Sequence, residues 1–96
     1  MKKAYLQTVV VNITKDSDYD VYIGRPSKWG NPFRLTDYAN DRQLIVKKYY
    51  EWFHAPKQWK LRDAAKRELN GKRLGCYCTP DACHGHVLAD FLNERS

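Results

Sequence analysis

The long connection between two short apolar segments, at residues 21–23 and 72–78, constrains the fold of this chain most. The residues between them contain two amphipathic patterns with helical spacing, one at residues 45–53 and one at residues 58–69. Antiparallel strands can be joined by a tight turn, whereas parallel strands need a crossover connection, usually a helix. The sequence therefore permits the two segments to pair as parallel strands, with the loops that follow them at the same edge of a sheet.

The remaining elements complete an α/β pattern. A β-branched run at residues 8–13 predicts a first strand, and the capping-box spacing of Asn40 and Gln43 predicts that a helix opens near Asn40. Pro56 ends that helix, and Thr79 and Pro80 are suited to begin a last one. The predicted order is β-β-α-α-β-α, a short three-stranded mixed sheet with helices packed on it. A chain of 96 residues has room for a single domain, residues 1–96.

The charge balance favours anionic partners. Lys and Arg number 17 against 11 Asp and Glu, a net charge of +6, and such a surface attracts nucleotides or nucleic acid. Basic residues and Trp59 in the second helix could follow a nucleic-acid backbone, although a solvated helix face explains them equally well. No apolar run approaches the roughly 20 residues of a membrane span, and the N-terminus lacks a signal-peptide pattern. We therefore expect a cytoplasmic protein with no membrane partner.

The loop at residues 24–33, rich in Gly and Pro, is the first candidate binding segment. Its Arg25, Ser27 and Lys28 can donate hydrogen bonds to phosphate oxygens, and Trp29 can stack on a base. The loop is no Walker A motif, because the Gly-Lys-Ser/Thr ending is absent. A rigid turn whose Trp29 and Phe33 fill the core is the alternative interpretation.

The second candidate segment holds Cys76, Cys78 and Cys83, followed by His84 and His86. Without a signal peptide a structural disulfide is not expected. Three thiolates with His86 could bind zinc, and His86 suits this better than His84 because its spacing from Cys83 places both on one helix face. Alternatively, Cys83 in the first turn of the last helix is an activated thiolate, with His84 or His86 as proton carrier. Small buried thiols that merely pack are the third interpretation.

Two segments of the chain resemble a family of unknown function, domain of unknown function 4326, found in bacteria and frequent in phages. The segments are VYIGRPSKWGNPF at residues 21–33, and GKRLGCYC at residues 71–78 followed by Pro80, Cys83-His84-Gly85 and Val87-Leu88. The resemblance extends over most of residues 21–92 and implies no particular activity. It implies that both loops form one site, and it adds Gly30 and Asn31 to the first. The chain departs from the family pattern at His86, where an acidic residue is frequent, and this weakens the zinc interpretation.

Three hypotheses follow. The leading one is a compact domain that binds a phosphate-bearing ligand, a nucleotide or nucleic acid, with Cys83 and His84 at the reacting or contacted group. Enzyme and binder stay equally open, and no cofactor is established. The second is a zinc-stabilised module, held by Cys76, Cys78, Cys83 and His86, for nucleic acid or protein interaction. The third is a phage accessory protein that binds a host protein in the host cytoplasm.

Overall fold

The computed structural model describes residues 7–77 and 83–94. Three strands form one sheet in the order β1-β3-β2, and both pairs are parallel, with Val10 and Val21 each opposite Leu74. The predicted α/β class and element order are confirmed, whereas the predicted mixed sheet is wrong, since every strand runs in the same direction. The elements are β1 (Val9–Asn12), β2 (Val21–Tyr22), η1 (Leu35–Tyr38), α1 (Arg42–Phe53), η2 (Pro56–Gln58), α2 (Trp59–Glu68), β3 (Arg73–Cys76) and α3 (His84–Asn93).

Helix α1 begins one residue later than the capping-box pattern predicts. Asp41 is its N-cap, and the Asp41 side chain accepts a hydrogen bond from the backbone N–H of Leu44 at 3.1 Å. Ala39 and Asn40 both have positive φ angles, 56° and 57°, so the chain turns there before the helix starts. Asparagine tolerates this left-handed conformation better than most residues do, which explains its place in the turn rather than at the cap.

Helix α3 also begins later than predicted. Its first residue is His84, and Cys83 is the N-cap with an extended backbone (φ −145°, ψ 140°). The sequence predicted Cys83 in the first turn of this helix. That prediction is wrong, because Cys83 precedes the first turn. The predicted starting residues Thr79 and Pro80 lie outside the described residues, as does Cys78.

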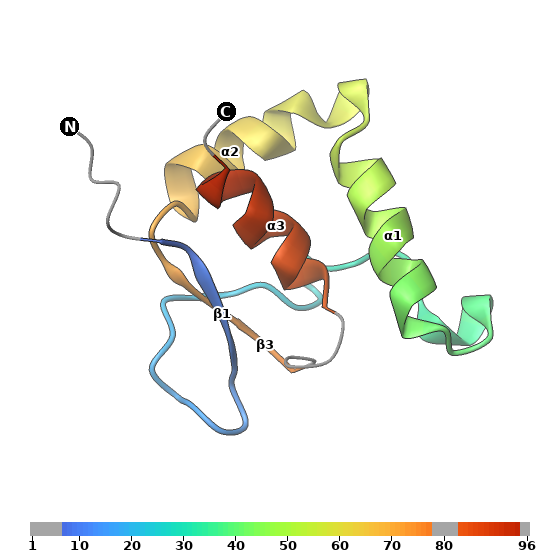
Figure 1. Cartoon of the computed structure of the whole chain (residues 1–96), viewed down its shortest axis with the longest axis horizontal. Coiled ribbons are helices and arrows are strands. Elements are labelled where there is room, and N and C mark those ends of the chain that lie inside the picture. Colours follow the sequence, from blue (N-terminus) through green and yellow to red (C-terminus); the bar gives the residue numbers. More distant parts are fainter. Residues whose placement is uncertain (1–6, 78–82, 95–96) are drawn as a thin grey trace.

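The helices cover the sheet and enclose the core. Helix α3 packs against β1, α1 and α2, and in Figure 1 it lies between α2 (yellow) and α1 (green), beside the β1–β3 pair. Gly85 makes this close packing possible, because a Cβ atom there would lie 2.8 Å from Cδ1 of Ile23 and 3.0 Å from Cγ1 of Val10. The largest fully buried side chains come from all layers: Ile23, Tyr49, Phe53, Leu69, Leu74 and Leu88.

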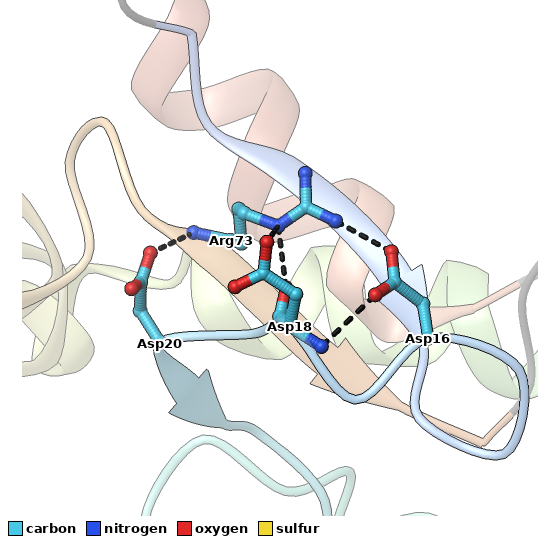
Figure 2. Close-up of polar contacts among 4 residues, drawn as sticks. All are labelled: Asp16, Asp18, Asp20 and Arg73. Carbon is cyan, nitrogen blue, oxygen red and sulfur yellow. Dashed lines mark hydrogen bonds and ion pairs between the residues drawn. The ribbon is translucent and has the colours of Figure 1, made fainter.

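Three aspartates of the β1–β2 connection surround Arg73 on β3 (Figure 2). The guanidinium donates to the carboxylate of Asp16 at 2.6 Å and to the backbone carbonyl of Asp18 at 2.5 Å. The carboxylate of Asp20 accepts from the backbone N–H of Arg73 at 2.8 Å, and Asp20 N–H donates to the carbonyl of Arg73 at the same distance. This cluster fastens the connection to β3 and leads the chain into β2.

Among the described residues, no helix is long and apolar enough to cross a membrane.

Candidate functional site

A pocket of about 480 Å³ opens where β2 and β3 end. Parallel strands present their carboxyl ends at one edge, and open α/β sheets commonly bind ligands there. The predicted parallel pairing of the second and third strands is confirmed, and the two candidate segments meet in this pocket. Its walls come from the loop after β2, from η1 and α1, and from the end of β3 with the start of α3: Tyr22, Gly24, Arg25, Asn31, Phe33, Arg34, Leu35, Thr36, Arg42, Ile45, Val46, Cys76, Tyr77, Cys83 and His84.

The loop after β2 is closed on itself and tied to α1. The guanidinium of Arg25 donates to the backbone carbonyl of Asn31 at 3.1 Å, and Gly30 passes so close that a Cβ atom would lie 2.8 Å from Cγ of Arg25. The buried Asn31 amide donates to the carbonyl of Ile45 at 3.2 Å, and its oxygen accepts from Phe33 N–H at 2.9 Å. Gly30 and Asn31 therefore shape the loop, while Arg25 projects from it at the pocket.

The loop residues predicted to bind ligand separate into two groups. Arg25 and Asn31 line the pocket. The other predicted residues of the loop do not: Ser27, Lys28, Trp29 and Gly30. Ser27 Oγ accepts from the backbone N–H of Trp29 at 3.3 Å, and the Lys28 ammonium forms an ion pair with Glu68 of α2 at 2.9 Å. These contacts direct both polar side chains away from the pocket.

Trp29 belongs to the hydrophobic core and is 3% exposed. Its backbone carbonyl accepts a hydrogen bond of 2.8 Å from the Tyr49 hydroxyl. Burial, and then the nearby Cys83, raise the pKa of the Tyr49 phenol well above its usual value, so this hydroxyl stays protonated and donates. The indole therefore has no open face on which a base could stack.

Cys76 and Cys83 are both 1% exposed and lie at the inner wall of the pocket, with their Sγ atoms 2.9 Å apart. The Cys83 sulfur also accepts from the backbone N–H of Gly85 at 3.4 Å, which caps α3. The N-terminal end of a helix carries partial positive charge, so this position favours negative charge on the sulfur. The structure thus brings together two of the three predicted thiols.

His84 stands next to Cys83 and is held in one tautomer. Its Nε2 is 2.8 Å from the backbone carbonyl of Ile23, which can only accept, so Nε2 carries the proton. Nδ1 then has a lone pair, and it lies 3.9 Å from Cys83 Sγ. Burial is the main cause that lowers the pKa of His84, which keeps the imidazole neutral near pH 7. The pair resembles a thiol beside a base, although the spacing is longer than a hydrogen bond between them requires.

The structure describes three of the four predicted zinc ligands. Cys76 and Cys83 lie together, Cys78 falls outside the described residues, and His86 is partly buried in the first turn of α3. Within the described ranges, 7–77 and 83–94, no group of three His, Cys, Asp or Glu side chains could hold a metal ion. The zinc hypothesis stays a prediction, because one of its ligands is not described.

Among the lining residues that sequence reasoning missed are two arginines and two tyrosines. Arg34 and Arg42 add their positive charge to that of Arg25, and all three are exposed. Tyr22 and Tyr77 contribute aromatic rings from the ends of β2 and β3. Arg34 directly follows the Gly/Pro-rich loop, and that position was its only signal. Arg42 begins α1, and no local pattern directs a helix-start arginine towards a distant loop.

These features define a class of protein, a small α/β domain with a parallel three-stranded sheet and an arginine-lined pocket at its carboxyl edge. The chain matches the family "Domain of unknown function (DUF4326)" over residues 9–94 and belongs to it, which confirms the resemblance seen in its two motifs. It is 36% identical over 86 residues to an "Uncharacterized 12.4 kDa protein in nrdA-td intergenic region" of Enterobacteria phage T4. That alignment covers 88% of this chain and 77% of the phage protein. No solved structure matches the chain.

Proposed function

We propose that this phage-related domain binds a phosphate-bearing ligand, a nucleotide or nucleic acid, in the pocket at the carboxyl edge of the sheet. One observation carries the proposal: Arg25, Arg34 and Arg42 line the pocket together, and none of the described lining residues is acidic. Three like charges at one pocket repel one another unless an anion neutralises them. The guanidinium group presents a planar fork of donors that matches phosphate oxygens.

The surrounding fold supports an anion at this place. Helix α3 begins at the pocket, and its dipole adds positive potential at that end. Arg25 is braced against the backbone of Asn31, so one cation is positioned before a ligand arrives. The net charge of +6 attracts an anionic ligand over a longer range.

The first test measures binding of inorganic triphosphate to the purified chain by calorimetry in low salt. Replacing Arg42 or Arg34 by Ala should weaken binding about 10- to 100-fold, because a hydrogen bond to a charged group contributes about 1.5–3 kcal/mol. Arg67→Ala is the matched control, since Arg67 pairs with Asp63 on the surface of α2 and does not line the pocket. The proposal fails if the unmodified chain binds no phosphate compound, or if all three variants bind alike.

Whether the domain also performs a reaction depends on Cys83 and His84. In that case Cys83 is the nucleophile and His84 Nδ1 accepts its proton. Cys83→Ser is a suitable probe, because serine is a good N-cap and should preserve α3. An enzyme would keep its ligand affinity and lose turnover in this variant, whereas a binder would bind as before and show no turnover in either form.

One contact favours zinc binding as a second candidate. In a tetrahedral zinc site the Zn–S distance is about 2.3 Å, which separates two sulfurs by about 3.8 Å. The Sγ atoms of Cys76 and Cys83, 2.9 Å apart, would have to separate by about 0.9 Å to share an ion. Native mass spectrometry with thiol counting tests this: one zinc per chain with three shielded thiols supports it, and a metal-free folded chain refutes it.

A further inference from the structure

Two tyrosines form an aromatic wall at the same pocket. Tyr22 ends β2, Tyr77 directly follows β3, and both line the pocket. Their ring centroids are 6.2 Å apart with an interplanar angle of 75°, an edge-to-face contact. Such a contact covers one face of one ring and neither face of the other. Tyr77 is 62% exposed, so much of its ring stays in contact with water.

The ring of Tyr22 is held in place by the loop after β2. Its hydroxyl donates to the backbone carbonyl of Arg25 at 2.9 Å. The ring passes so close to Gly24 that a Cβ atom there would lie 2.6 Å from Cζ of Tyr22. One ring of the aromatic wall therefore contacts the loop that carries Arg25. The backbone of Tyr77 is fixed as well, because its carbonyl accepts from the Asn12 amide at 3.3 Å.

The size and composition of the pocket suggest a ligand larger than phosphate. Pockets for small organic ligands measure about 300–1,000 Å³, and this one measures about 480 Å³. Its charged side chains come from the loop after β2 and the start of α1, while two of its aromatic rings, Tyr22 and Tyr77, stand at the strand ends and a third, Phe33, comes from the loop. A nucleoside phosphate has the same division into an anionic part and a flat aromatic part.

We propose that the nucleobase of this ligand stacks on Tyr77, against the wall formed with Tyr22, while its phosphates contact Arg25, Arg34 and Arg42. This inference rests on the proposed function and assigns the base-stacking role to Tyr77 in place of the buried Trp29. Stacking needs only a π-face, so the wall selects a base over a bare phosphate and accepts different bases. The same chemistry occurs in a free nucleotide and at the end of a nucleic-acid strand.

The test compares ATP with inorganic triphosphate, which carries the phosphates without the base, by calorimetry on the unmodified chain and on Tyr77→Ala. ATP should bind about 5- to 150-fold more tightly than triphosphate, the range for stacking one base on an aromatic ring. Tyr77→Ala should remove this difference, whereas Tyr77→Phe should keep it. Tyr50→Ala is the matched control, an equally exposed tyrosine outside the pocket.

The outcomes separate this inference from the proposed function. If triphosphate and ATP bind equally and Tyr77→Ala changes neither, the nucleobase inference is overturned and anion binding stands. If neither compound binds, the proposed function fails and the inference fails with it. A 5′-phosphorylated trinucleotide identifies the source of the base: tighter binding than AMP assigns the site to a strand end, and weaker binding assigns it to a free nucleotide.

Discussion

The hydrogen bond from Tyr49 to the loop after β2 should contribute measurably to stability. Tyr49 is fully buried in α1, and its hydroxyl donates to the carbonyl of Trp29 at 2.8 Å. Tyr49→Phe keeps the ring, which stacks on Phe53 at 6.0 Å, and removes only the donor. The substitution therefore isolates one bond between the pocket loop and α1.

The expected loss of stability arises because the backbone carbonyl of Trp29 stays in the core without its donor. Removing one partner of a buried hydrogen bond costs about 1–3 kcal/mol, so we expect a loss of about 2 kcal/mol in the free energy of unfolding. For a domain of this size each kcal/mol lowers Tm by about 4–8 °C, so Tm should fall by about 8–16 °C. The loop also carries Arg25, and phosphate affinity should decline in the same variant.

Urea denaturation followed by circular dichroism measures this loss, with thermal melting as the second readout. Tyr50→Phe is the control, because Tyr50 neighbours Tyr49 in sequence but is 55% exposed. Its stability should stay within about 0.5 kcal/mol of the unmodified chain. If Tyr49→Phe is equally stable, the hydroxyl does not hold the loop, and our explanation of how the pocket is positioned is wrong.

Three further predictions concern packing, charge and pH. Gly85→Ala should lose about 1–3 kcal/mol of stability in urea denaturation, because the added methyl group collides with the buried Ile23; an unchanged midpoint would contradict the close packing of α3. Arg73→Ala should cost about 1 kcal/mol at low salt and less in 1 M NaCl, since it leaves Asp16 and Asp18 without their cation; equal losses at both salt concentrations would show that charge is not the cause. Burial lowers the pKa of His84 below its unfolded value of 6.5, so the unfolded chain binds the proton first and stability should fall as pH drops below about 6.5, by up to about 1.4 kcal/mol per pH unit. His84→Gln should reduce that slope in urea denaturation between pH 7 and 5. His54→Gln is the comparison, because the pKa of His54 is lowered as well. An unchanged slope in His84→Gln would show that His84 does not cause the loss of stability.

The element order was predictable because it depends on local patterns. The apolar face at Ile45, Tyr49 and Phe53 is buried as its helical spacing predicts. Pro56 lies just beyond the end of α1, where its missing N–H cannot continue the helix. The length of their connection permitted the parallel pairing of β2 with β3, and the structure confirms it. The direction of β1 could not be predicted in this way, because β1 and β3 are neighbours in the sheet but are not consecutive in the chain.

The composition of the site was predictable only in part. The sequence indicated the loop at residues 24–33 and the segment around Cys83, and both contribute to the pocket. It could not tell that Lys28 points towards Glu68, because these residues are 40 positions apart. The leading hypothesis assigned base stacking to Trp29 and kept a core-filling role as the alternative, and the structure places Trp29 in the core.

The sequence by itself determined the α/β class, the order of the elements, the family and the two segments that meet. These properties depend on short-range periodicity, on turn residues and on the length of one connection. Only the tertiary structure decided which side chains face the pocket, adding Arg34, Arg42 and Tyr77 and withdrawing Lys28 and Trp29. The physical reason is that the direction of a loop side chain is set by its partners, and those partners come from elements far away in the chain.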